Sequence, residues 1–216
     1  MRFDLRRCLP ALGAAALASC GDLRVIPEGD AAPAPEIPIA MTNFVLTSHD
    51  EITGPGQRVE AVRGEMFEGA GYATLQDFTL HFYQDGQVVS EVSADWGRVD
   101  IDRSTFVAFA QDERIKIRRL DENVILYVTQ IAYDPETRRL TTALPQGVEA
   151  PGNTDEQFVM VQATPDGGAW ISQGRGVSAD LQLNARFTRP SMTRSPTFDV
   201  AAFDAEYRPI HREDTP

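Results

Sequence analysis

The sequence predicts an all-β fold in which antiparallel strands follow one another as hairpins. Apolar and polar residues alternate along several stretches, for example around Phe78, Leu80 and Phe82, and this period of two is typical of strands with one buried face. Turn-forming residues such as Asp85-Gly86 and those at 165–168 separate the stretches. No segment beyond residue 41 keeps a helical period for three turns, which favours a sheet over a helical bundle.

The first 19 residues have the features of a secretory signal, and residue 20 extends them. Three arginines within residues 2–7 precede an apolar stretch at 9–19, which is too short for a membrane-spanning helix of about 20 residues. The run Leu17-Ala18-Ser19 before Cys20 resembles a bacterial lipobox. This resemblance implies that the Cys20 sulfur receives a diacylglyceryl group and that cleavage makes Cys20 the N-terminus. The alternative is an ordinary secretory signal with an incidental cysteine.

Composition limits what the mature chain can bind. Removing residues 1–19 takes away three arginines and one aspartate, so the net charge of −12 becomes −14. Such an acidic chain is a poor partner for nucleic acid or for anionic lipid heads. Cys8 lies in the signal, so Cys20 is the remaining cysteine, and an internal disulfide or a cysteine metal site is excluded. About 195 residues are enough for one domain with a sizeable core.

Four regions are predicted along the chain. Residues 1–19 form the signal, and residues 20–40 form a tether rich in proline and alanine that extends about 3.1 Å per residue, unless it packs on the domain as coil. The β domain covers residues 41–188. The tail at 189–216 is expected to be partly disordered, although its apolar group at 198–203 could add a strand or a helical turn.

A short pattern repeats along the β domain. Ala61-x-x-Gly64 recurs as Ala94-x-x-Gly97 and, in degenerate form, at 129–132 and 173–176. Small residues at matching points of successive hairpins let neighbouring backbones approach closely where a sheet bends. Units that stack on their neighbours build an elongated sheet, which is the shape that this repeat predicts.

Several of these segments resemble the periplasmic lipopolysaccharide-export proteins of the LptC and LptA (OstA-like) superfamily. The similarity covers residues 42–188 and depends on patterning rather than on invariant catalytic residues. One departure is the anchor, since LptC has an N-terminal transmembrane helix and this chain has a lipobox. The matching segments are Thr42–Thr47, Val59–Glu65, Glu91–Val99 and Ile131–Leu140.

The resemblance implies an open antiparallel β-jellyroll, a taco-shaped sheet with an apolar interior and end strands that pair with neighbouring proteins. It implies a role in lipopolysaccharide export, in which acyl chains are held in a groove and passed on by end-to-end strand pairing. The implied partners are lipopolysaccharide or a similar glycolipid, an LptA-like bridge protein and the membrane subunits of an ABC transporter. The implied location is the periplasm, at the inner membrane in preference to the outer membrane.

Strand parity selects the side chains that would line such a groove. Apolar area that leaves water contributes about 25 cal/mol per Å², so an apolar interior would favour the binding of acyl chains. The alternative is an ordinary packed core, as in a structural or interaction lipoprotein of the cell envelope. The edge strands expected at 43–48 and 181–187 offer backbone groups to partners, unless the linker and tail cover them. The candidate groove residues are Phe44, Leu46, Phe78, Leu80, Phe82, Phe106, Ile115, Ile117, Leu126 and Val128.

The polar residues do not indicate catalysis. The histidines at 49, 81 and 211 lie far apart and have no companions at metal-ligand spacing. Aspartates such as Asp100 and Asp102 fall in expected turns, where solvation explains them. The chain contains no Gly-x-Ser-x-Gly, and its Gly174-Arg175-Gly176 lies in a predicted hairpin rather than before a helix. We therefore expect no enzyme activity, no cofactor and no metal.

Overall fold

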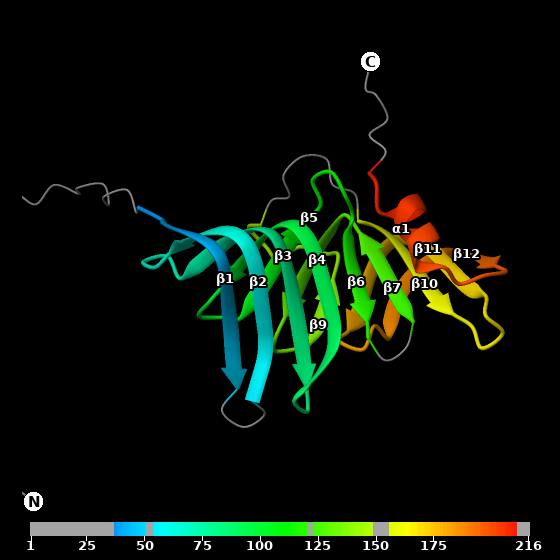
Figure 1. The fold of residues 1–216 in the computed structure, drawn as a ribbon, viewed down its shortest axis with the longest axis horizontal. Helices are drawn as coiled ribbons and strands as arrows, with labels where there is room; N and C mark the ends of the chain where they lie inside the picture. The colour runs from blue at the N-terminus through cyan, green and yellow to red at the C-terminus, as the bar shows by residue number, and fades with distance from the viewer. Residues whose placement is uncertain (1–36, 51–53, 121–122, 149–155, 211–216) are drawn as a thin grey trace, which may run out of the picture. The chain divides into compact units, whose positions relative to one another are not determined.

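The computed structural model describes residues 37–50, 54–120, 123–148 and 156–210, and nearly all of their regular structure is strand (Figure 1). The predicted signal, Cys20 and most of the predicted tether lie outside these residues. The all-β, antiparallel prediction is confirmed. The elements are β1 (Ile39–Asp50), β2 (Gly54–Phe67), β3 (Tyr72–Gln84), β4 (Gln87–Asp100), β5 (Thr105–Phe109), β6 (Ile115–Arg119), β7 (Val124–Val128), β8 (Gln130–Asp134), β9 (Arg139–Thr141), β10 (Gln157–Ala163), β11 (Ala169–Asp180), β12 (Ala185–Ser195) and α1 (Val200–Tyr207).

One 12-stranded sheet contains all the strands, and it divides at β4. The first half of β4 pairs with β6 through residues 90–93, whereas its second half pairs with β5 through residues 96–100. The two branches meet again at β11, which pairs with β10 and with β9. The strands from β4 through β5, β8, β9, β11, β10, β7 and β6 therefore close a ring. Outside it, β1–β3 continue from β4 and β12 continues from β11, so the sheet is open at β1 and β12.

The register aligns aliphatic side chains in rows across the strands. Each member of a row faces its neighbour directly, so the side chains cover one another and form a continuous apolar surface. Burial of each such side chain is worth about 1.5–3 kcal/mol. The longest row runs across seven strands, from β1 to β10, and consists of Leu46, Val59, Leu80, Val92, Ile117, Leu126 and Met160.

The Ala-x-x-Gly repeat has a packing explanation. Ala61 and Ala94 both lie opposite Phe78, so two small residues flank a large one. A Cβ atom on Gly64 would lie 2.5 Å from the Thr74 carbonyl oxygen, and one on Gly97 would lie 2.7 Å from the Phe78 ring. Both glycines are needed because a neighbouring ring or backbone occupies the space of a side chain.

The sheet is irregular at one level, between the alanine and the glycine of this motif. Asn43 in β1 and Asp77 in β3 have φ values of 48° and 49°, in the left-handed region. The paired residues on either side show that Val62 and Asp95 lie at the same level in β2 and β4. Short polar side chains tolerate this backbone better than other non-glycine residues do. The irregularity crosses four strands together.

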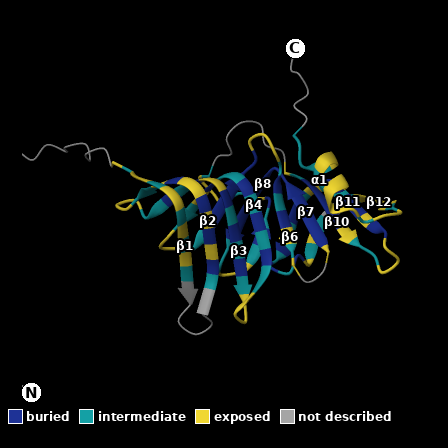
Figure 2. Ribbon diagram, viewed as in Figure 1, coloured by how far each residue is buried: buried dark blue, intermediate teal, exposed yellow. Residues whose placement is uncertain are grey.

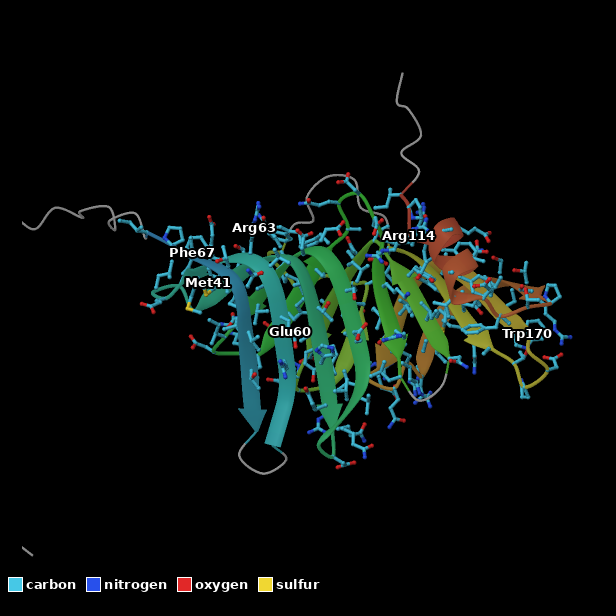
Figure 3. All side chains as sticks on the ribbon, viewed as in Figure 1. Met41, Glu60, Arg63, Phe67, Arg114 and Trp170 are labelled. Atoms are coloured by element: carbon cyan, nitrogen blue, oxygen red, sulfur yellow. The ribbon has the colours of Figure 1, made fainter. Side chains whose placement is uncertain are left out.

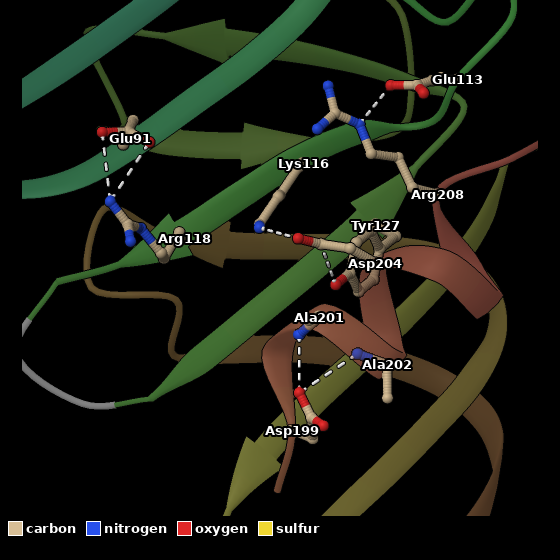
Figure 4. A network of polar contacts seen from close by, with 10 residues as sticks. All are labelled: Glu91, Glu113, Lys116, Arg118, Tyr127, Asp199, Ala201, Ala202, Asp204 and Arg208. Atoms are coloured by element: carbon tan, nitrogen blue, oxygen red, sulfur yellow. Dashed lines mark hydrogen bonds and ion pairs between the residues drawn. The ribbon is translucent and has the colours of Figure 1, made fainter.

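The tail segment forms a strand and a helix. β12 runs through residue 188, where the sequence places the end of the domain, as far as Ser195. The Asp199 carboxylate accepts hydrogen bonds from Ala201 N and Ala202 N and so caps α1 (Figure 4). Phe203 of α1 is buried on a second apolar cluster, on the outer side of β7, β10 and β11. The apolar group at 198–203 therefore contributes to a two-turn helix and not to a strand.

A carboxylate on α1 connects the helix to two strands. Asp204 accepts a hydrogen bond from Tyr127 Oη at 2.7 Å and forms an ion pair with Lys116 Nζ at 2.7 Å (Figure 4). Burial, followed by the Asp204 contact, raises the pKa of the Tyr127 phenol well above its usual 10.0. The Tyr127 phenol is therefore neutral in the folded chain.

We expect the free energy of unfolding to fall as the pH rises above about 10, and Tyr127→Phe to reduce this fall. The unfolded tyrosine ionises near its usual pKa, while the folded one holds its proton, so alkaline solution favours the unfolded chain. Part of the fall remains in the variant, because the pKa of Tyr207 is also raised, to about 12, mainly by burial. Denaturant titrations between about pH 8 and about pH 11 measure the slope. An identical slope for both proteins would contradict the assignment.

Candidate functional site

The ten predicted groove residues all face one interior. Eight of them are buried with side chains that are 0–3% exposed, and Phe44 and Leu46 are partly buried against the same cluster. Period-two parity therefore placed residues from β1, β3, β5, β6 and β7 on a common side. Whether an acyl chain occupies this interior remains a prediction.

Side chains fill the interior of the sheet. The rings of Phe82 and Tyr133, from β3 and β8, have centroids 4.7 Å apart, and those of Phe78 and Phe106 are 5.6 Å apart. Figure 2 shows buried residues concentrated on the central strands, while β1, β2 and the α1 surface carry more exposed ones. The interior is therefore least fully buried next to β1 and β2, and a groove is expected on that side.

An apolar hollow opens on that side. It has a volume of about 150 Å³ and lies between β1–β2 and the end of β4 with the turn that follows. We call it the recess. Leu46, Val59, Val99 and Ile101 supply its apolar walls. Leu46 and Val59 start the longest aliphatic row, so the recess is continuous with the buried interior.

A larger and more polar cavity adjoins the recess. Its volume is about 480 Å³, and we call it the mouth. The ends of β2 and β3, the β8–β9 turn and the β11–β12 turn surround it. Ser48, Gln57 and Ser104 line both cavities, which places the mouth and the recess side by side. Other residues that line the mouth are Tyr83, Gln84, Tyr133, Arg138, Asp180 and Gln182.

Two polar contacts separate the mouth from the recess. Gln57 Nε2 donates to the Ser104 carbonyl oxygen at 3.4 Å, and the hydroxyl oxygens of Ser48 and Ser104 are also 3.4 Å apart. Both distances are near the upper limit for a hydrogen bond, so each contact contributes little. These contacts join β1 and β2 to the β4–β5 turn across the hollow.

The wall of the mouth is held in place by hydrogen bonds. The Asp180 carboxylate accepts from the backbone N–H groups of Gln182 and Asn184 and from Asn184 Nδ2, all at 2.9 Å. Gln182 Nε2 donates to Gln84 Oε1 at 3.2 Å. Burial raises the pKa of the Tyr133 phenol, so its hydroxyl stays neutral and can both donate and accept. The mouth therefore presents neutral amide and hydroxyl groups.

The mouth was not predicted from the sequence, although one signal for it exists. In β2 the inward positions run Ala61, Val59 and then Gln57, so a polar side chain follows the apolar ones at an inward position. Gln57 is polar but buried, since only 8% of its surface is exposed. Ser48 follows Leu46 in the same way on β1. Turns supply the remaining wall, and period-two patterning does not describe turns.

The two free edges of the sheet differ. β1 carries no charged residue between Ile39 and Ser48, and long uncharged edges favour pairing with another strand. β12 carries Arg186, Pro190 and Arg194, and its pairing with β11 shifts register twice. These features discourage strand addition. Met41 of β1 lies at one end of the sheet and Trp170 of β11 at the other (Figure 3).

One of the two predicted edges lies where the sequence placed it, and the other is shifted along the chain. Residues 43–48 lie in β1 and pair with β2 alone among the described strands. Of residues 181–187, the last three belong to β12, whereas Leu181 and Leu183 are buried in the core. The free part of this edge begins later in the chain than the sequence analysis placed it.

Two further findings concern the described residues. No group of three or more His, Cys, Asp or Glu side chains among them is arranged to hold a metal ion. The single helix they contain is not long and apolar enough to cross a membrane.

No family model matches the sequence, and no curated protein matches it. The chain is similar to the crystal structure of LptH from Pseudomonas aeruginosa, described as the LptA homologous periplasmic component of the lipopolysaccharide transport device. The identity is 13% and the TM-score 0.43, and the match covers 64% of this chain and 92% of that one.

Proposed function

We propose that this chain is a periplasmic component of lipopolysaccharide export, anchored to a membrane through a lipid on Cys20. In this proposal the acyl chains of lipopolysaccharide or a similar glycolipid enter the interior of the sheet, and a partner receives them by pairing a strand with the sheet edge. The resemblance of residues 42–188 to the LptC and LptA superfamily motivates the proposal. The partners are then an LptA-like bridge protein and ABC-transporter membrane subunits, and the inner membrane is the preferred anchor site.

The observation that carries the proposal is the recess. Its walls continue into an aliphatic row that crosses the sheet, which suits a hydrocarbon tail. Each methylene that leaves water contributes about 0.8 kcal/mol. The volume of about 150 Å³ is smaller than the usual ligand pocket of about 300 Å³ or more. A tail therefore enters when β1 and β2 move away from the β4–β5 turn, which the weak contacts of Ser104 permit.

Edge pairing completes the proposal. The free edge of β1 offers unpaired backbone groups without charges to repel an incoming strand, and added main-chain hydrogen bonds provide the affinity. β1 also carries Phe44 and Leu46 against the interior, so a strand added there would continue the apolar surface. We place the partner contact at β1.

A second function is also supported, because the core is densely packed. Leu80, Phe82 and Ile117 are 0% exposed, which is what a structural or interaction lipoprotein of the envelope with a filled β core requires. Such a protein would use the β1 edge for partners and would carry no lipid. The two functions differ in whether lipid reaches the inner side of β1.

Photo-crosslinking from β1 tests the proposal. A photoreactive amino acid at Leu46, which lines the recess, is expected to capture labelled lipopolysaccharide in cells. The same amino acid at Val45 is the matched control, because Val45 is the next residue on the strand and its side chain is 52% exposed. Lipid captured at 46 and absent at 45 supports transport. Lipid absent from both positions, with crosslinks to protein alone, contradicts transport and favours the scaffold.

A further inference from the structure

We propose that the mouth and the recess together bind an amphiphile, with its uncharged sugar head in the mouth and its hydrocarbon tail in the recess. The inference rests on the proposed function, and it assigns the orientation of the ligand and the groups that recognise its head. The mouth and its polar residues have no part in the acyl-chain groove predicted from the sequence.

The polarity of the two cavities argues for a ligand with two unlike ends. The aliphatic side chains that line the recess include Leu46, Val59 and Val99, beside the Asp100 carboxylate and the polar residues that it shares with the mouth. The mouth, at about 480 Å³, has the size of an ordinary ligand site and is lined by amides and hydroxyls. Because both cavities share Ser48, Gln57 and Ser104, one molecule can occupy them together once the two weak contacts of Ser104 part.

The charge of the mouth favours an uncharged head. Among the described residues that line it, Arg138 and Asp180 are the charged ones. Asp180 already accepts three N–H groups from the β11–β12 turn. An anionic head would therefore meet one cation and one occupied carboxylate.

The neutral groups match the chemistry of a sugar. Glutamine amides and tyrosine or serine hydroxyls both donate and accept, as sugar hydroxyls do. The mouth presents three glutamines, at 57, 84 and 182. Tyr83 and Tyr133 add rings whose apolar body and polar tip suit a boundary between water and hydrocarbon.

Three soluble probes test this assignment on the full chain, with the two detergents kept below their critical micelle concentrations. Dodecyl maltoside has the sugar and the tail, dodecylphosphocholine has the same tail without a sugar, and maltose has the sugar without a tail. Calorimetry should show dodecyl maltoside binding at least tenfold more tightly than either of the others. Equal binding of dodecylphosphocholine would overturn the sugar assignment. Equal binding of maltose would overturn the role of the recess.

Two variants and a control locate the site. Ile101→Glu places a charge in the recess at a side chain that is 42% exposed, so it should weaken dodecyl maltoside binding at least tenfold without unfolding the chain. Gln182→Ala removes an amide from the mouth and should weaken binding severalfold while leaving dodecylphosphocholine unaffected. Leu120→Glu is the control, because Leu120 is 45% exposed and lines neither cavity. Equal effects of Ile101→Glu and Leu120→Glu would overturn the proposal.

The result is separable from the proposed function. Lipopolysaccharide captured at Leu46, together with dodecyl maltoside binding that Gln182→Ala does not change, would leave transport standing and overturn the mouth as the head site. Dodecyl maltoside binding that depends on Ile101 and Gln182, with no lipopolysaccharide captured at Leu46, would uphold the mouth and overturn the transport role.

Discussion

Phe82→Ala is expected to lower the free energy of unfolding by about 3–5 kcal/mol. Phe82 is 0% exposed, and its phenyl ring on β3 lies against Tyr133 of β8 across the interior. Removing the phenyl ring leaves a cavity between β3 and β8, and the hydrogen-bonded strands around it limit how far the walls can collapse. Urea titration followed by circular dichroism measures the loss.

Phe67→Ala is the matched control for this prediction. Phe67 is partly exposed and stacks on Tyr72 beside the β2–β3 turn, with ring centroids 4.7 Å apart. A contact of this kind is worth about 0.5–1.5 kcal/mol. If the two substitutions cost the same, Phe82 does not lie in a packed interior, and the filled-core alternative loses its main support.

The second large effect is expected at Gly64. Gly64→Val should cost at least about 1–3 kcal/mol, because its Cβ would lie 2.5 Å from a backbone oxygen of β3 and 2.7 Å from the Phe44 ring. The ring can rotate, but the backbone oxygen moves only if β2 and β3 separate. The same urea titration measures this loss.

Gly56→Ala is the control, since nothing lies within 4 Å of the position its Cβ would take. It should change stability by less than about 0.5 kcal/mol. A Gly64→Val chain as stable as Gly56→Ala would mean that the Ala-x-x-Gly repeat does not mark close packing.

The sequence predicted the strands and the direction of their side chains, because both depend on local alternation. Leu80, Phe106 and Ile117 each stand at an inward position that parity alone defines. The division at β4 could not be predicted in this way. Its residues 90–93 and 96–100 alternate alike, yet they pair with different strands on the same edge. Strand pairing over long sequence separations leaves no local signal.

The candidate site was predicted in its apolar part and missed in its polar part. Leu46 was selected by parity, because it lies two residues after Phe44 on the same strand. Gln57, Tyr133 and Gln182 come together from three separate parts of the chain, and the turns that place the last of them follow no period. A polar residue that ends an inward apolar series, as Gln57 does on β2, is the signal that such a mouth leaves in a sequence.

A reversible disulfide lock shows whether lipid tails reach the interior between β1–β2 and the β4–β5 turn. The hydroxyl oxygens of Ser48 and Ser104 lie 3.4 Å apart, so the two side chains face each other, and oxidation of the pair Ser48→Cys and Ser104→Cys is expected to join them in a disulfide. The readout is capture of labelled lipopolysaccharide by a photoreactive group at Leu46. We expect that oxidation of the double variant abolishes capture, that reduction restores it, and that neither single variant responds. Equal capture by the oxidised and reduced double variant would mean that lipid tails do not enter between β1–β2 and the β4–β5 turn.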